Sequence, residues 1–310
     1  MGEAAEGAIE YRWLPRPAAR PAGLTPYAPI DAPETSAPRR LRNPPPVGDR
    51  VGGVVFPKPA AGPEPAREQK QAGVILVGEW WGIDSHVLQL GRSIAAAGFD
   101  VVCLDIFRDG PGAIPVDVRR RYHTAEGLRD AFAESAHKMK TCDWASALVD
   151  VAAAAEWLRD EEGGAGTAGR ARSDSVAVVG CSFGAVLALL AAAASRTADQ
   201  SNDDAVCEDT LPPPPVDAAV AFYGLPEDRF TGGSARLWDA ARVGVPCQLH
   251  FPSAAPGLEG FDDVARGRAL LDELRAAAAG SGRSHELHEY LVRPCRHTHT
   301  HRQRERQSKV

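Results

Sequence analysis

The pentapeptide at residues 180–184, Gly-Cys-Ser-Phe-Gly, has the residue types and the spacing needed for nucleophilic catalysis. It matches the pattern G-x-S-x-G, in which a serine hydroxyl stands on a sharp turn between a strand and a helix. The two glycines let the strand and the helix approach each other without a clash of Cβ atoms. The helix that follows would direct N–H groups and its positive dipole end at a developing oxyanion. The pattern therefore predicts acyl transfer with Ser182 as the nucleophile.

The same pentapeptide also has interpretations other than catalysis by Ser182. A glycine-rich turn without any chemistry would have the same sequence. Cys181 would be the nucleophile only if the turn were displaced by one residue. Nucleotide binding is not supported at this position, because the pentapeptide fits neither G-x-G-x-x-G nor a phosphate loop that ends in GK[ST].

The elements that must position Ser182 follow from the pattern of apolar residues. Residues 74–77 are a continuous apolar run, which suits a strand that is buried on both faces of a parallel sheet. Further strands are predicted at residues 101–104, 176–179, 218–223, 245–251 and 287–292. Helical patterns lie between them, at residues 87–97, 144–159, 185–194 and 264–279. Residues 110–140 form a polar stretch with mixed helical signals. This alternation predicts an α/β fold with a doubly wound, mainly parallel sheet.

Composition divides the 310 residues into one folded domain with two extensions. Of the 25 prolines, 14 fall in residues 1–66, which we predict to be a partly disordered N-terminal arm with one or two edge strands. Residues 67–292 form the predicted domain. Residues 293–310 are a basic tail of net charge +5, which leaves −11 for the rest of the chain, and we expect this tail to be disordered. The acidic body argues against nucleic acid as a partner.

The cysteines and the apolar runs bear on the cellular location of the protein. None of the six cysteines forms a C-x-x-C pair, so a zinc or redox motif is not supported. No apolar run reaches the ~18 residues that a membrane-spanning helix needs, and no signal peptide is recognisable at the N-terminus. We therefore expect a cytoplasmic protein that does not bind membranes.

Four segments resemble the dienelactone hydrolase family of the α/β-hydrolase superfamily: residues 73–83, 98–108, 178–184 and 217–224. The resemblance implies an α/β-hydrolase fold, hydrolysis of a small ester or lactone, and no metal or cofactor. The family's nucleophile is usually a cysteine, and Ser182 stands at the matching position. Glu79 falls where the family keeps a carboxylate beside the nucleophile, although a strand-end surface acid would look the same. By position, the backbone N–H groups of Phe183 and Trp80 would bind the oxyanion.

The second half of the chain departs from the family pattern. The stretch at residues 250–255 has no Asp at the place where the family keeps its triad Asp. Asp262 is the predicted triad acid, with a helix N-cap as an equally good interpretation. His297 is the predicted base, although no Gly precedes it and no Phe follows it. Alternating histidines at 297, 299 and 301 also resemble a weak metal-binding tail. The family's last helix has no counterpart, and we expect that the natural C-terminal end has been replaced.

Substrate-binding residues are predicted less directly. Trp81, beside Trp80, would form the wall of an apolar pocket, with core packing as the alternative. Tyr223 ends a strand and would face the site. Arg129 is the predicted contact for a substrate carboxylate, among further arginines at positions 119–121. The predicted protein is a monomeric or weakly dimeric ester hydrolase, and the alternative is a catalytically impaired α/β-hydrolase-fold protein that binds a ligand or a partner.

Overall fold

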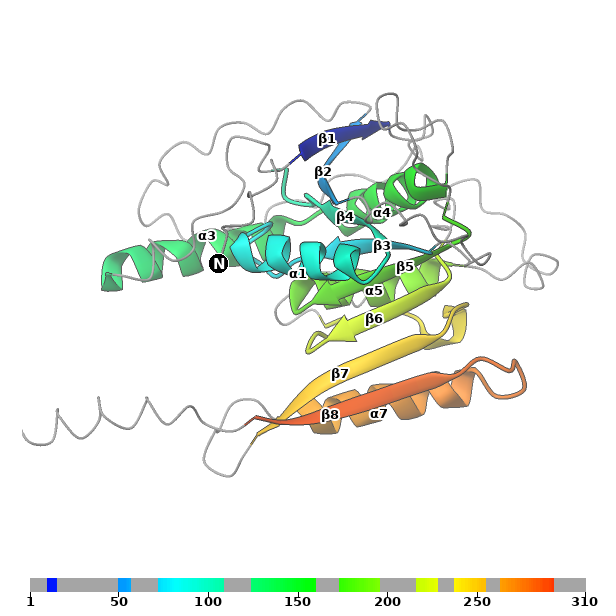
Figure 1. Ribbon diagram of the computed structural model, residues 1–310. Coiled ribbons are helices and arrows are strands. Elements are labelled where there is room, and N and C mark those ends of the chain that lie inside the picture. Colours follow the sequence, from blue (N-terminus) through cyan, green and yellow to red (C-terminus); the bar gives the residue numbers. More distant parts are fainter. Residues whose placement is uncertain are drawn as a thin grey trace, which may run out of the picture.

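A computed structural model describes residues 10–15, 50–56, 72–108, 124–159, 173–195, 216–227, 237–254 and 263–292. Within them, one eight-stranded sheet has the order β1-β2-β4-β3-β5-β6-β7-β8 (Figure 1). The strands are β1 Glu10–Pro15, β2 Arg50–Phe56, β3 Ala72–Val77, β4 Asp100–Leu104, β5 Ser175–Cys181, β6 Ala218–Phe222, β7 Cys247–Ala254 and β8 His285–Val292. Strands β1 and β2 pair antiparallel with each other, and β2 pairs antiparallel with β4, whereas the other neighbours are parallel. The two antiparallel strands come from the segment predicted as the arm.

Helices cover both faces of this sheet. They are α1 Ser85–Ala96, α3 Ala125–Thr141, α4 Trp144–Arg159, α5 Phe183–Ala194 and α7 Asp263–Ala277, with a 3₁₀ turn η3 at Ala240–Arg242. Helix α1 packs with Val74 and Leu76 of β3 on one face, and α4, α5 and α7 lie over the other (Figure 1). Because successive strand residues point to opposite faces, continuous apolar strands are what a sheet covered on both sides requires. The predicted doubly wound α/β-hydrolase fold is confirmed.

Six described strands, in the order β4-β3-β5-β6-β7-β8, run parallel to one another and position the site. Val77 of β3 pairs with Gly180 of β5, and Cys181 at the end of β5 pairs with Phe222 of β6. The carboxyl ends of these strands therefore meet at one edge of the sheet. In open α/β sheets this edge is the usual location of a binding site. Within the described residues, no helix is long and apolar enough to cross a membrane.

Helix α3 is the element that the sequence indicated least clearly. Thr124 caps it by accepting a hydrogen bond from the Gly127 N–H group at 3.0 Å, and Glu126 in its first turn suits the helix dipole. Its packing against the body includes Phe132, which contacts the rings of Trp80 and Trp81, and the partly buried Met139. In Figure 1, α3 projects from the end of the sheet where the loop after β3 lies.

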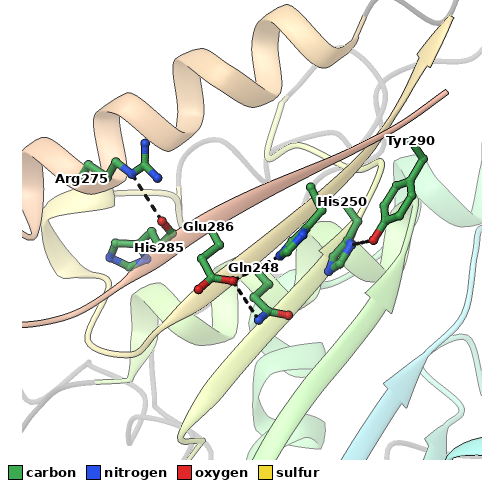
Figure 2. A network of polar contacts seen from close by, with 7 residues as sticks. Gln248, His250, Arg275, His285, Glu286 and Tyr290 are labelled. Carbon is green, nitrogen blue, oxygen red and sulfur yellow. Dashed lines mark hydrogen bonds and ion pairs between the residues drawn. The ribbon is translucent and has the colours of Figure 1, made fainter.

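Polar side chains connect the last two strands to each other and to α7. The Gln248 amide of β7 donates to the Glu286 carboxylate of β8 at 3.2 Å, and Arg275 of α7 donates to the backbone carbonyl of His285 at 3.3 Å (Figure 2). The His285 side chain is buried, and its Nδ1 atom has no hydrogen-bond partner among the described residues. Burial lowers the pKa of His285, and the charges of Arg283 and Arg275 lower it further.

The buried His285 predicts that the protein loses stability in mild acid. As pH falls through about 6.5, the unfolded chain takes up a proton that the folded imidazole resists, so the free energy of unfolding decreases. Urea unfolding at pH 7.5 and pH 5.5 measures this decrease. His285→Leu removes the titrating group, and the decrease should become smaller in that variant. An equal decrease in both proteins would contradict this role of His285.

Candidate active site

The turn between β5 and α5 has the geometry of a nucleophile elbow. Ser182 has φ 52° and ψ −110°, a conformation that side-chain-bearing residues rarely adopt. Its N–H group donates to the Phe222 carbonyl at 2.8 Å, and its carbonyl accepts from the Ala185 N–H group at 3.0 Å. The strained residue is Ser182 and not Cys181, so the strand–turn–helix context is present in the register that the sequence indicated.

Three glycines allow the elbow to pack tightly. A Cβ atom on Gly180 would overlap the backbone of Gly184, and one on Gly184 would overlap the backbone at the end of β3. A Cβ atom on Gly224, just after β6, would overlap the carbonyl oxygen of Ser182. The first turn of α5 is therefore in direct backbone contact with the ends of two strands, and this contact holds Ser182 in its strained conformation.

The loop after β3 lies next to this elbow. The Gly82 N–H group donates to the Glu79 carbonyl at 3.0 Å, which closes a tight turn around Trp80 and Trp81, and Gly82 has a φ of 89°. Phe183 is the first residue of α5. Its side chain is buried against Trp144, and the centroids of the two rings are 4.5 Å apart. The two predicted oxyanion donors, Phe183 and Trp80, thus belong to neighbouring segments at the same sheet edge.

Glu79 and Tyr223 form a hydrogen bond at the carboxyl edge of the sheet. The Tyr223 hydroxyl donates to Glu79 Oε1 at 2.7 Å. Burial raises the pKa of Tyr223 well above its usual value, and the hydrogen bond to the Glu79 carboxylate adds to the effect, so the phenol keeps its proton. The sequence predicted both residues for the site, but it did not predict that they bind each other.

The Cys181 thiol is buried beside this pair. Burial raises the pKa of Cys181 to about 11, the charge of Glu79 raises it as well, and a hydrogen bond with Tyr223 opposes the rise. The thiol is therefore protonated near neutral pH, and a protonated thiol is a poor nucleophile. This chemistry, like the backbone geometry, disfavours Cys181 as the reactive residue.

An aromatic cluster of Trp80, Trp81 and Phe132 stands beside Glu79. The ring centroids of Trp80 and Trp81 are 5.1 Å apart, and Phe132 lies 5.4 Å from Trp80 and 5.7 Å from Trp81. Phe132 is 43% exposed, which is unusual for its type. Phe132 was not among the predicted site residues, although an aromatic residue in a polar stretch was the available signal. Arg129 is exposed one helical turn before Phe132 on α3.

Two predicted triad residues, Asp262 and His297, lie outside the described residues. Among the residues that the structure does describe, the Ser182 hydroxyl has no hydrogen-bond partner. His250 and His288 are on β7 and β8, where their rings stack with centroids 4.7 Å apart, and His250 Nδ1 lies 2.8 Å from the Tyr290 hydroxyl (Figure 2). His250 therefore has its hydrogen-bond partner on the neighbouring strand β8, and His288 lies 3.2 Å from Glu286 on β8 itself.

No part of the described chain groups three His, Cys, Asp or Glu side chains as a metal site would. The histidines at 297, 299 and 301 lie outside that part. One G-x-G-x-x-G sequence does occur in the chain, at residues 164–169. It comes after a helix, α4, whereas a dinucleotide loop comes after a strand, and it is also outside the described residues.

Residues 59–202 match the sequence model of the dienelactone hydrolase family. This segment belongs to the dienelactone hydrolase family. It contains Glu79, Trp80 and the whole elbow, and membership indicates a hydrolase. No curated protein matches the chain.

Several solved structures are similar to this chain, all at low identity. A putative dienelactone hydrolase from Klebsiella pneumoniae is 19% identical with a TM-score of 0.48, and the match covers 91% of this chain and 85% of that one. A dienelactone hydrolase-like promiscuous phosphotriesterase from metagenomic libraries is 15% identical with a TM-score of 0.40, over 91% and 82% of the two chains. Esterase 2 from Thermogutta terrifontis is 13% identical with a TM-score of 0.42, over 79% of each chain.

The contact at the elbow predicts different costs for two glycine substitutions. Gly180→Ala forces a Cβ atom into the backbone of Gly184 and should lower the free energy of unfolding by about 3 kcal/mol or more. Gly98→Ala is the matched control, because Gly98 has a φ of 101° but open space around it, and it should cost about 1–2 kcal/mol. Urea unfolding measures both. Equal costs would contradict the backbone contact.

Proposed function

We propose that the protein hydrolyses a small ester or lactone through an acyl-enzyme on Ser182. The observation that carries this proposal is the strained Ser182, at φ 52° between a buried strand and a helix N-terminus, inside the segment that belongs to a hydrolase family. Strain of this kind is kept where the surrounding structure imposes it, and it is concentrated at functional sites.

The proposed reaction follows the chemistry of a serine triad. Ser182 Oγ attacks the carbonyl carbon of the substrate, and His297 takes the hydroxyl proton and returns it to the leaving alkoxide. Asp262 orients the imidazole and stabilises its charged form. The N–H groups of Phe183 and Trp80 bind the oxyanion. Water then attacks the acyl-enzyme by the same steps, releasing the acid and restoring Ser182.

The chain order supports these roles for Asp262 and His297. Asp262 lies between β7 and α7, and His297 follows β8 by five residues. Both belong to connections that leave the carboxyl ends of parallel strands, the edge at which Ser182 stands. Glu79, the proposed carboxylate beside the nucleophile, follows β3 at the same carboxyl edge of the sheet.

The substrate class is proposed from the aromatic cluster and from Arg129. Trp80, Trp81 and Phe132 offer apolar ring surface beside Glu79, which suits the hydrocarbon part of a small ester or lactone. Arg129, one turn away on α3, suits a carboxylate on the same molecule. Trp81 and Arg129 therefore keep their proposed roles in substrate binding.

A second candidate function is ligand binding without catalysis. The observation that favours it is that the Ser182 hydroxyl has no hydrogen-bond partner among the described residues, and so no base there. A serine without a base is a weak nucleophile. The following two experiments distinguish this possibility from hydrolysis.

Ser182→Ala should reduce kcat for p-nitrophenyl acetate by at least about 1,000-fold, because the variant has no nucleophile. Ser195→Ala is the matched control. Ser195 stands at the other end of α5, where its hydroxyl donates to the Ala191 carbonyl at 2.8 Å, and activity should be retained. Wild-type rates in Ser182→Ala would reject the proposed function.

Three single variants of the C-terminal histidines test the base. His297→Asn should lower kcat by about 1,000-fold or more, since Ser182 then has no proton acceptor. His299→Asn and His301→Asn serve as controls of the same type and should stay near wild type. Normal activity in His297→Asn, or a loss of the same size in one of the controls, would contradict the assignment.

A further inference from the structure

The hydrogen bond between Tyr223 and Glu79 passes over the end of strand β5. Glu79 follows β3 and Tyr223 follows β6, and these strands are not neighbours, because β5 lies between them. Neighbouring strands are about 4.8 Å apart, so the two backbones are roughly 10 Å apart. Side chains from the two flanking strands can meet at 2.7 Å only by reaching over the last residues of β5. Those residues lead directly into Ser182.

The surroundings of Cys181 also place Glu79 and Tyr223 over the end of β5. Cys181 is the residue before Ser182, and its thiol interacts with both Glu79 and Tyr223. Glu79, Tyr223 and Cys181 thus form one cluster at the elbow, in which Cys181 is buried, Glu79 is partly buried and Tyr223 is exposed. Within it, the Tyr223 hydroxyl is the donor and the Glu79 carboxylate is the acceptor.

The backbone at Tyr223 is held in an unusual conformation. Tyr223 has a φ of 45°, and its N–H group donates to the His250 carbonyl of β7 at 2.8 Å. The next residue, Gly224, is in contact with the Ser182 carbonyl. A bulky residue with positive φ is strained, and it persists only where the surrounding structure imposes it. Here the strain directs the phenol back across the sheet edge, toward Glu79.

We propose that Tyr223 is a positioning residue, whose hydroxyl holds the Glu79 carboxylate over the elbow that carries Ser182. This inference rests on the proposed hydrolase function. It replaces substrate contact as the role of the Tyr223 hydroxyl, because that hydroxyl already donates to a carboxylate of the protein. A hydrogen bond to a charged acceptor is among the stronger ones in proteins, so its loss should be measurable.

The test is Tyr223→Phe, which removes the hydroxyl and keeps the ring. We expect kcat for p-nitrophenyl acetate to fall about 10-fold to 100-fold, with KM changed by less than about 2-fold. Tyr290→Phe is the matched control, since it also removes a tyrosine hydroxyl with a 2.8 Å hydrogen bond, to His250. It should leave kcat unchanged. If Tyr223→Phe does not fold, Tyr223→Asn replaces it, because asparagine accepts a positive φ more readily.

A double-mutant cycle with Glu79→Gln separates positioning from a purely structural role. If Tyr223 acts through the Glu79 carboxylate, then Tyr223→Phe should change kcat by less than about 2-fold once Glu79 is replaced. A tyrosine that only supports the turn, or that touches the substrate, would give the same factor in both backgrounds. Thermal unfolding of all four proteins shows whether differences in folding contribute.

The outcomes distinguish this inference from the function on which it rests. Full activity in Ser182→Ala would reject the hydrolase mechanism itself. With Ser182→Ala inactive, an unchanged kcat in Tyr223→Phe, or an equal loss in the two Glu79 backgrounds, would overturn the positioning role and leave the hydrolase proposal intact. A loss of kcat on Tyr223→Phe that occurs only when Glu79 is present supports both the positioning role and the hydrolase proposal.

Discussion

The contact of the first turn of α5 with the ends of β3 and β6 is the constraint on which the site depends. It requires glycine at positions 180, 184 and 224, because a Cβ atom at any of them would overlap backbone. Such close approach leaves little choice of conformation for the residue at the turn, and Ser182 adopts a φ of 52°. The hydroxyl is thereby presented at the carboxyl edge of a sheet whose faces are covered by helices.

The chemistry at that edge is set by which groups keep their protons. Burial raises the pKa of Cys181, so the thiol keeps its proton, and the Tyr223 hydroxyl donates its hydrogen bond to the Glu79 carboxylate. This hydrogen bond keeps the Glu79 carboxylate at the carboxyl edge of the sheet, beside the turn that carries Ser182. The strained conformation of Tyr223 belongs to the same arrangement, since it brings the phenol to the carboxylate.

Much of this fold could be predicted from the sequence, because strands β3 to β6 are rich in apolar residues and the elbow has a distinctive spacing. Helix α3 was less predictable, since its residues are polar and it has limited packing against the body. The hydrogen bond between Glu79 and Tyr223 joins residues 144 positions apart and depends on the strand order, which local patterns do not encode. The roles of Asp262 and His297 remain predictions, because both residues lie outside the described parts of the chain.

Covalent labelling with diisopropyl fluorophosphate tests the central claim, that Ser182 is an activated nucleophile, most directly. The serine oxygen would form a bond to phosphorus, and fluoride would leave with the hydroxyl proton transferred to the base. Peptide mass spectrometry of the treated protein should find one diisopropylphosphoryl group, on Ser182. The absence of labelling, or a label on Cys181 or on another residue in place of Ser182, would contradict the account.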